Sequence, residues 1–343
     1  MNWFAINWFA MKRKFRRPVV LVVSKQTLAI ALCLLAAGLA TPLGAGAPPW
    51  RTAAAASVRH GGLRPELEQI AARFDRPPVN ARLDPVWRLI PELNGARLNI
   101  GATERSAGGA NPRLVFDQIP PAVRMRDLVA APIYRGNPGK REMALMFNVA
   151  WGTEHVPQIL RILRERGARA TFFLDGSWVR ANPAAARQIA DAGMDIGNHA
   201  YNHPLFRRLS RAQMIAQLEK TSAAISAATG RRVALFAPPA GDFNDLAVRV
   251  AAGLGMKTIL WTLDTVDWRR PPAQTILNRI VPRREPGALV LMHPTAPTVA
   301  ALPAMIAALQ KDGYRLVTVS ALLDPVRPVP GTLREAQAAA PAR

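Results

Sequence analysis

The chain has 343 residues, enough for one large domain and a small one, because single domains typically run to ~100–200 residues. Its 45 Lys and Arg residues outnumber its 23 Asp and Glu residues. The resulting positive field favours anionic partners such as wall polymers, nucleic acid or phospholipid surfaces, and does not choose among them. The single cysteine, Cys33, excludes a disulfide within the chain, so the fold must be stabilised by its core alone.

The N-terminal residues have the order of an export signal. A basic run at residues 11–17 precedes an apolar stretch from Thr27 to Ala47. This stretch is long enough to span a hydrocarbon core of ~30 Å, with the basic residues on the cytoplasmic side. The small residues at its end would suit a signal peptidase, but Pro48 and Pro49 follow them. We therefore expect residues 1–47 to form an uncleaved signal-anchor in the cell membrane, with the rest extracytoplasmic; secretion after cleavage is the alternative.

A tether and a small module are expected next. Residues 48–62 mix Pro, Ala and Gly without periodicity, which is typical of a tether. Residues 63–138 are expected to form a small α+β accessory module. Its pattern predicts helices at Pro65–Phe74 and Val86–Ile90. It predicts strands at Arg97–Ile100 and Arg113–Phe116. The sequence assigns this module no function.

Short apolar runs alternate with helical patterns from residue 139 to residue 326. The runs lie at residues 143–147, 170–174, 194–197, 233–236, 258–263, 289–292 and 316–319. The helical patterns lie near residues 155–167, 178–192, 210–229, 243–254, 273–283 and 298–312. This alternation predicts an α/β fold, a distorted (β/α) barrel of about seven parallel strands. We expect residues 327–343 to be a disordered tail.

Polar side chains gather after the predicted strands, where parallel α/β folds place their active sites. His199 and His203 follow the third run, and His293 follows the sixth. Four residues apart, the first two imidazoles can turn to one side, which suits a divalent metal such as zinc. A surface pair is the alternative, but the position of His293 favours a metal or acid–base site.

A pair of aspartates and a tryptophan follow the fifth run. Either Asp264 or Asp267 could orient His293 and raise its basicity, which would make it a general acid. Trp268 could form the wall of a sugar-sized groove. The alternative is that both aspartates only cap the following segment.

These clusters resemble the polysaccharide deacetylases of carbohydrate esterase family four over about residues 140–325. The resemblance rests on five motifs in the family's order, Asn148–Gly152, Asn198–Pro204, Ala237–Gly241, Asp264–Trp268 and Leu291–Pro294. Three of them also look like the sporulation-linked, membrane-tethered branch of the family. The resemblance implies a metal-dependent hydrolase that removes acetyl groups from N-acetylated sugars of peptidoglycan or chitin-like glycan.

The resemblance also implies roles for single residues. It makes His199 and His203 metal ligands, with zinc as the expected metal, and it makes His293 the general acid oriented by Asp264. The residues that it implies for substrate binding are Trp268, Leu291, Pro239 and Tyr201.

Three positions depart from the family's pattern. Asn148 stands where the family has its general base, and an amide cannot take a proton from water near neutral pH. Val149 stands in place of an aspartate metal ligand, and Ala237 in place of the arginine that would hold the base. Loss of a general base costs ~10²–10⁴ in rate. Glu154 or His155 could replace the missing ligand, unless they only begin the next helix.

Two functions therefore stay open. The first is a deacetylase of N-acetylated cell-wall glycan, weakened by the missing base and ligand. The second is a non-catalytic glycan-binding or scaffolding protein of the bacterial envelope or spore wall. Nucleic-acid binding conflicts with the export signal, and we expect a monomer.

Overall fold

The computed structural model describes residues 62–106 and 111–339. The expected signal-anchor lies outside these residues, as does the tether apart from Gly62. Among the described residues, no helix combines the length and the apolar character that crossing a membrane requires.

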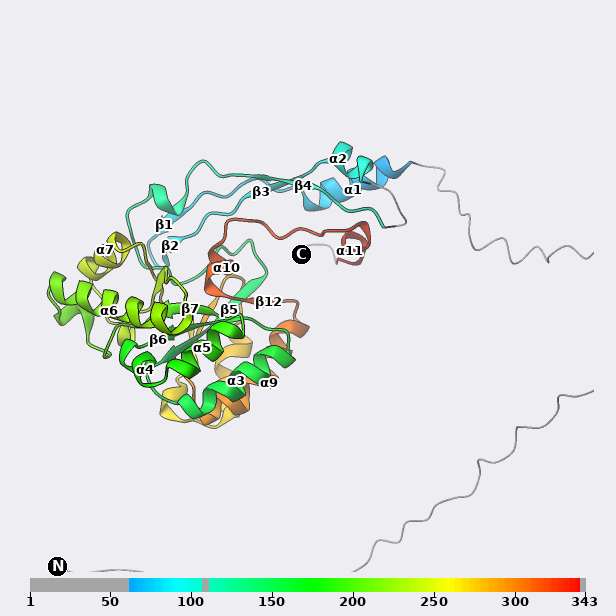
Figure 1. The fold of residues 1–343 in the computed structure, drawn as a ribbon. Coiled ribbons are helices and arrows are strands. Elements are labelled where there is room, and N and C mark those ends of the chain that lie inside the picture. The colour runs from blue at the N-terminus through cyan, green and yellow to red at the C-terminus, as the bar shows by residue number, and fades with distance from the viewer. Residues whose placement is uncertain (1–61, 107–110, 340–343) are drawn as a thin grey trace, which may run out of the picture. The chain divides into compact units, whose positions relative to one another are not determined.

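A parallel sheet forms the centre of the larger part of the fold (Figure 1). Its strands are β5 Glu142–Val149, β6 Ala170–Leu174, β7 Asp195–Asn198, β8 Leu235–Phe236, β9 Lys257–Thr258, β10 Leu263–Asp264, β11 Leu289–Met292 and β12 Arg315–Val317. Seven of them follow the order β10-β11-β5-β6-β7-β8-β9, and β12 also pairs with β5. All these pairs are parallel. The structure confirms the α/β class, and the path of strands is that of an open barrel.

Helices cover the outside of this sheet and alternate with its strands. They are α3 Val156–Glu165, α4 Gly176–Ala181, α5 Pro183–Asp191, α6 Arg211–Thr229, α7 Asp245–Gly253, α8 Ala273–Ile280, α9 Ala296–Lys311 and α10 Val319–Leu323. Sequence signals set their ends. For example, α6 is preceded by its N-cap Ser210, whose side chain accepts from the Gln213 N–H, and is followed by its C-cap Gly230 with a φ of 70°.

Both faces of β5 are buried, which explains why its sequence is an apolar run rather than an alternating one. Phe147 and Val149 belong to the core cluster that includes residues of α3 and α9. Ala144 and Met146 belong to a second cluster, inside the curve of the sheet. Since side chains alternate along a strand, Asn148 lies on the inner side and Val149 on the helix side.

Two of the predicted elements of the barrel are divided in the structure. The run 258–263 is two strands, because Ile133 bridges to Ile259 between them and the Leu260 N–H donates to the Ile133 carbonyl. The helical pattern 178–192 is two helices, α4 and α5. The break is at Asn182, since a residue before a proline is disfavoured in the helical conformation.

The accessory region is built from short elements. They are α1 Leu63–Phe74, β1 Arg82–Asp84, β2 Arg88–Ile90, β3 Gly95–Leu98, α2 Ile100–Arg105 and β4 Phe116–Ile119. The prediction of a helix at Val86–Ile90 is wrong. Asp84 accepts the N–H groups of Val86 and Trp87, which closes a turn, and β2 then pairs antiparallel with β1. The strand predicted at Arg113–Phe116 begins later, where β4 pairs with β3.

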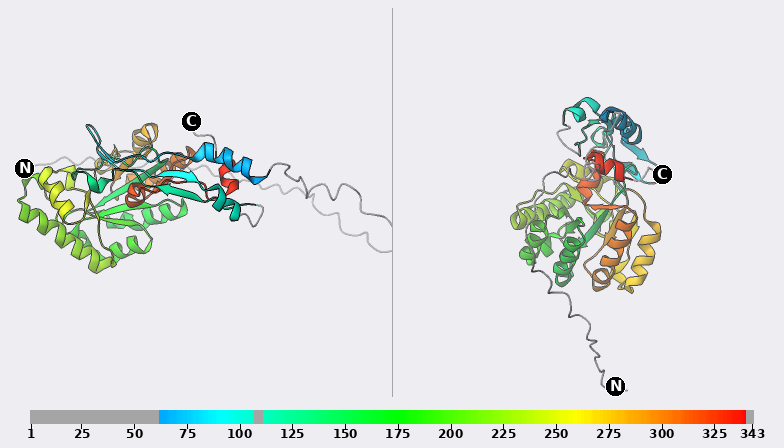
Figure 2. Two further views of the ribbon diagram at one scale, coloured as in Figure 1. Left: turned by 90° about the horizontal axis from the view of Figure 1, so that it is seen from above. Right: turned by 90° about the vertical axis from the view of Figure 1, so that its right-hand side faces the viewer.

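The prediction of a disordered C-terminal tail is wrong for the described residues. Helix α11, Leu333–Ala338, is capped by Thr332, whose side chain accepts the Glu335 N–H. Leu333 and Ala336 are buried in one cluster with Leu67 and Ile70 of α1. Figure 2 shows α11 in red beside α1 in blue. Both ends of the described chain therefore belong to one small core.

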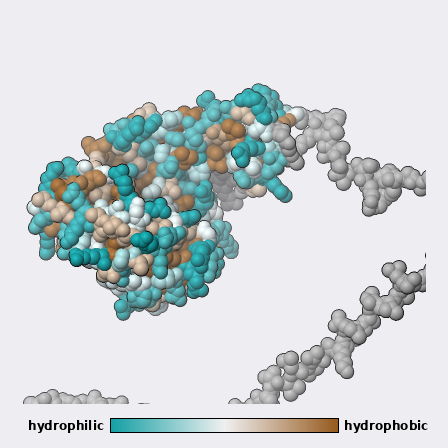
Figure 3. Space-filling model, viewed as in Figure 1, coloured by the Kyte–Doolittle hydropathy of each residue, from teal (hydrophilic) through white to brown (hydrophobic). Residues whose placement is uncertain are grey.

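The face seen in Figure 3 mixes hydrophilic and hydrophobic residues over the barrel and the accessory region. The large hydrophobic residues that are most exposed include Val86 in the β1–β2 turn at 73% and Trp268 at 50%. Single exposed apolar residues are ordinary on protein surfaces. An exposed tryptophan beside polar clusters is less ordinary and points to the site described next.

The cluster around α11 makes a prediction for stability. Leu333 has 3% of its surface exposed, so we expect Leu333→Ala to lower the free energy of unfolding by about 2–4 kcal/mol. Urea denaturation of the chain measures this change. The neighbouring exposed residue gives the control, since Arg334→Ala should stay within about 0.5 kcal/mol of wild type. Equal stability of both variants would mean that α11 does not belong to the core.

Candidate functional site

A cavity of about 400 Å³ lies at the carboxyl ends of the sheet strands. It is lined by Asn148, Ala150, Trp151, His199, His203, Ala240, Trp261, Asp264, Trp268, Leu291 and His293. The three histidines that sequence analysis singled out thus line one cavity, although β7 and β11 present them from distant parts of the chain.

His199 is held at the bottom of this site as a neutral imidazole. It is 2% exposed, and its Nδ1 lies 2.7 Å from the carbonyl oxygen of Ala237. The imidazole therefore donates from Nδ1, which leaves Nε2 as the unprotonated nitrogen. Burial lowers the pKa of His199 to about 3, and the nearby His203 and His293 act in the same direction while the hydrogen bond to Ala237 opposes them.

A tight loop brings His203 back to His199. Ala200 and His203 both have left-handed backbone conformations, with φ of 61° and 57°. The centres of the two imidazole rings lie 5.2 Å apart and the ring planes meet at 71°. Non-glycine residues in this conformation are held there by their surroundings, so the spacing of the two rings is set by the fold.

Asp267 orients His293, and the assignment of this role to Asp264 is wrong. The Asp267 Oδ1 accepts from His293 Nδ1 at 2.8 Å, and its Oδ2 accepts from the His293 backbone N–H and from the Thr298 hydroxyl, both at 2.6 Å. Asp264 instead accepts the Val266 N–H at 2.8 Å. The left-handed turn at Val266, with a φ of 54°, points the second aspartate inward.

Tryptophans form the walls of the cavity. Trp151 stacks on His293 with a centroid distance of 5.9 Å and a 4° angle between the ring planes. Trp151 and Trp268 both line the cavity and are 43% and 50% exposed, and the Arg269 guanidinium lies 4.7 Å from the centre of the Trp268 ring. Trp151 and Trp261 were missed by the sequence analysis. An aromatic residue directly after a predicted strand is the signal that could have found Trp151.

Two residues implied for substrate binding do not line the cavity. Pro239 is buried, and the neighbouring Ala240 takes its place with a φ of 55°. Tyr201 turns toward α6, where the Lys220 ammonium lies 3.7 Å from the centre of its ring. Pro239 and Tyr201 therefore contribute no side chain to the lining of this cavity, and their role in substrate binding stays a prediction. Trp268 and Leu291 do line the cavity.

The described side chains do not fit a catalytic zinc site, which normally has three protein ligands and an open position. His199 and His203 offer two nitrogens. Val149, at the expected third position, is fully buried on the helix side of β5 and does not line the cavity. Within residues 62–106 and 111–339 there is no group of three His, Cys, Asp or Glu side chains that could hold a metal ion.

Glu154 and His155 do not supply the missing ligand. They belong to the one-turn helix that leads into α3, and neither lines the cavity. The Glu154 carboxylate lies 3.5 Å from His155 Nε2. The alternative that they only begin the next helix is the one that the structure bears out.

The position expected for a general base is occupied by a poorly satisfied amide. Asn148 is 4% exposed, and its Oδ1 is buried without a hydrogen-bond partner among the described residues. Ala237, directly after β8, is fully buried and brings no guanidinium group to the cavity. Asn148 and His199 lie in one cavity, but neither carries a negative charge that could activate water.

Comparisons with known proteins agree with this geometry. Residues 135–259 match the family model described as polysaccharide deacetylase. An uncharacterized protein of Bacillus subtilis is 40% identical over 269 residues, which are 77% of this chain and 84% of that protein. A peptidoglycan-N-acetylglucosamine deacetylase of Bacillus cereus is 35% identical over 187 residues, which are 53% of this chain and 87% of that protein. This chain belongs to the polysaccharide deacetylase family.

A solved structure from Bacillus anthracis, described as a CE4 family pseudoenzyme, is similar to this family member over a longer stretch. The TM-score is 0.73 at 41% identity, and the match covers 78% of this chain and 96% of that one. It therefore includes part of the accessory region as well as the barrel. The family predicted from the sequence is confirmed.

The buried imidazole predicts a dependence of stability on pH. In the folded protein the pKa of His199 is lowered from 6.5 to about 3. The stability that the neutral ring contributes is therefore present above pH 6.5 and is lost as pH falls toward 3. We expect the free energy of unfolding to fall by about 2 kcal/mol between pH 7 and pH 5 because of this residue alone. The measurement is urea denaturation at both pH values for wild type and His199→Asn.

The variant keeps an N–H donor for Ala237 but has no titratable ring, so it should lose less stability than wild type on acidification. His155→Asn is the control, because it removes a histidine that is 25% exposed, and it should behave as wild type does. Identical pH dependence of His199→Asn and wild type would contradict the neutral assignment.

A single substitution should improve the metal site. Asn148→Asp places a carboxylate in the cavity that His199 and His203 also line, and we expect zinc affinity to rise by about tenfold, because a negative charge near the two imidazoles attracts the cation. Zinc titration by calorimetry measures the change. Asn202→Asp adds the same charge at an exposed position of the His199–His203 loop and should have little effect. Equal affinities of the two variants would show that residue 148 does not reach the metal position.

Proposed function

We propose that this chain binds N-acetylated glycan of the cell wall, peptidoglycan or a chitin-like polymer, and that it no longer catalyses efficient deacetylation. One observation carries the proposal. The cavity keeps its tryptophan walls and its histidines, but Asn148 occupies the position of the base, and among the described residues no group of three possible ligands could hold a metal ion. A groove with aromatic walls and few charges can bind a sugar without reacting with it.

The comparisons support both halves of this proposal. The deacetylase of Bacillus cereus acts, by its name, on N-acetylglucosamine of peptidoglycan. The similar structure from Bacillus anthracis is described as a pseudoenzyme, and a variant of it is described as having restored enzymatic activity. A member of this family can therefore keep the fold while lacking turnover.

A second function, slow hydrolysis of the acetamide group, is favoured by the His293–Asp267 pair. The carboxylate holds the ring by Nδ1 at 2.8 Å, so His293 can present Nε2 to a leaving group as a general acid would. The cavity also holds the Asp264 carboxylate, but Asn148, which occupies the position of the family's base, cannot activate water. We therefore place this function second.

The proposal includes export. The basic run at residues 11–17 and the apolar stretch that follows it are the features that support anchoring in the cell membrane. Anchored in this way, the cavity would meet wall glycan directly outside the membrane.

Two measurements on the same protein test the proposal. We expect a tetramer of N-acetylglucosamine to bind in calorimetry, and Trp268→Ala to weaken binding by about tenfold, which is 1.4 kcal/mol, because one stacking face is lost. Val326→Ala, which removes an exposed side chain outside the cavity, should bind as wild type does. No binding by wild type would contradict the glycan-binding half.

Acetate release from the tetramer and from peptidoglycan tests the other half, with and without added zinc or cobalt. We expect equal, background release by wild type and His199→Ala. Release by wild type that exceeds that of His199→Ala would instead establish the slow hydrolase.

A further inference from the structure

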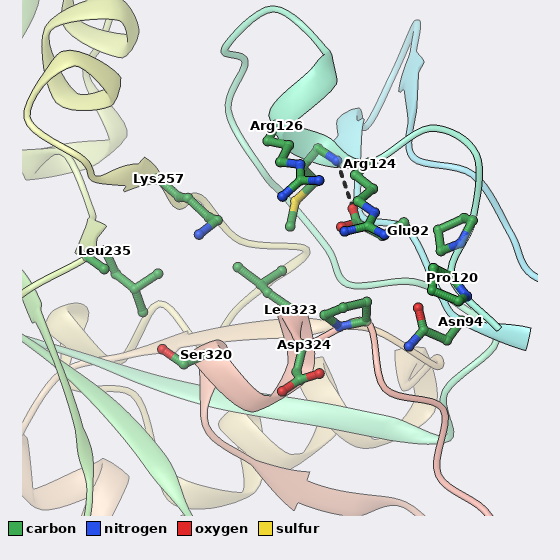
Figure 4. A pocket seen from close by; sticks show the side chains of 14 residues that line it. Glu92, Asn94, Pro120, Arg124, Arg126, Leu235, Lys257, Ser320, Leu323 and Asp324 are labelled. Carbon is green, nitrogen blue, oxygen red and sulfur yellow. Dashed lines mark hydrogen bonds between the residues drawn. The ribbon is translucent and has the colours of Figure 1, made fainter. Parts of the chain in front are cut away.

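A second cavity lies at the amino ends of β8 and β9, the end of the sheet opposite the histidines, between the barrel and the accessory region (Figure 4). Its volume is about 470 Å³, within the range of ~300–1,000 Å³ that is usual for small-ligand sites. It is lined by Glu92, Asn94, Pro120, Pro121, Arg124, Met125, Arg126, Ala234, Leu235, Lys257, Ser320, Leu323, Asp324 and Pro325. Leu235 and Lys257 begin β8 and β9, and no described residue lines both cavities.

Basic side chains reach into this cavity from two elements. Lys257 comes from β9, and Arg124 and Arg126 come from the loop after β4 (Figure 4). Within the described residues, neither Lys257 nor Arg124 takes part in an ion pair, and Arg126 has only an exposed contact of 3.7 Å with Asp127. These three cations are therefore available to an anionic group.

The cavity also presents two carboxylates that the backbone holds in place. Glu92 is 7% exposed and accepts the Met125 N–H at 2.8 Å. Asp324, at the end of α10, accepts the Val326 N–H at 2.8 Å. In Figure 4, Asp324 lies on the α10 side of the cavity, and Lys257 and Arg126 reach in from the other side. Glu92 lies on the side of the arginines, at Met125, so Asp324 is the carboxylate that faces Lys257 and Arg126 across a partly apolar lining that includes Leu235 and Leu323.

A ligand that matches this lining carries both charges. We propose that the cavity binds the end of a short peptide with a free carboxylate and an ammonium group, of the kind attached to peptidoglycan glycan. The carboxylate would meet Lys257 and Arg126, and the ammonium would meet Asp324. The choice of a wall peptide rests on the proposed function, whereas the match to a ligand with both charges rests on the lining alone.

Calorimetry with the peptide lysyl-alanyl-alanine tests this inference on the full-length protein. We expect the free peptide to bind, and its C-terminal amide and its doubly N-acetylated form each to bind about tenfold more weakly, because each lacks one charge-assisted hydrogen bond. No binding of the free peptide, or equal binding of all three forms, would overturn the proposal.

Variants then locate the binding. Lys257→Gln and Arg126→Gln should each weaken binding of the free peptide by about tenfold. Asp324→Asn keeps the acceptor for Val326 and should weaken binding of the free peptide but not of the acetylated one. Lys311→Gln, at the exposed end of α9, should have no effect. Binding that none of the three cavity variants changes places the peptide elsewhere and overturns the assignment.

The two proposals fail separately. Each variant is also titrated with the N-acetylglucosamine tetramer, which we expect to bind to all of them as to wild type. Loss of peptide binding with retained tetramer binding is the result expected of the cavity variants. If the wild type binds the tetramer but not the peptide, only the second cavity is misassigned; if it binds the peptide but not the tetramer, the glycan-binding function fails while this cavity stands.

Discussion

Side chains of β5 alternate between the interior of the curved sheet and the helix layer, and both sides are buried. This alternation decides which side chains at the end of β5 face the cavity. Asn148 faces the cavity, while Val149 packs with the helices and adds to the core. A strand that is paired on both sides, with β11 and β6, cannot rotate one residue without moving every neighbour. The site is thus constrained to one usable side chain at this position.

The losses around that side chain form a consistent set. A guanidinium group at residue 237 without a carboxylate at residue 148 would be a buried, unpaired charge, which is strongly destabilising. Alanine and asparagine remove both charges together. The cavity then holds a neutral His199, whose pKa is lowered to about 3 by burial, and a histidine already paired with Asp267. Apart from the Asp264 carboxylate, such a site has no charged group at the positions where the family has its base and the arginine beside it.

The sequence predicts those features that depend on local pattern. Alternation of apolar runs and helices is enough for the parallel sheet, and the rule that sites follow strand ends is enough to bring the three histidines together. The family motifs identify Asn148, Val149 and Ala237 as departures before any coordinates are considered.

Features that depend on distant partners or on unusual backbone could not be predicted. Asp264 and Asp267 are equivalent in the sequence, and only the left-handed Val266 decides which of them faces His293. Helix α11 is six residues long and has no strong pattern of its own; it is stabilised by Leu67 and Ile70, more than 250 residues earlier in the chain. Trp261 reaches the cavity because the strand predicted at 258–263 is interrupted by Ile133.

Asp267 has three hydrogen bonds, to the ring and the backbone of His293 and to Thr298 in the first turn of α9. These hydrogen bonds therefore hold the segment after β10 against the end of β11 and the start of α9, whether or not the site is catalytic. Its replacement would remove hydrogen bonds that join three elements, so selection for a correctly folded protein is sufficient to keep the histidine–aspartate pair. In proteins of this kind, a surviving dyad is a poor indicator of turnover, and the strand end that carries Asn148 is the better place to look.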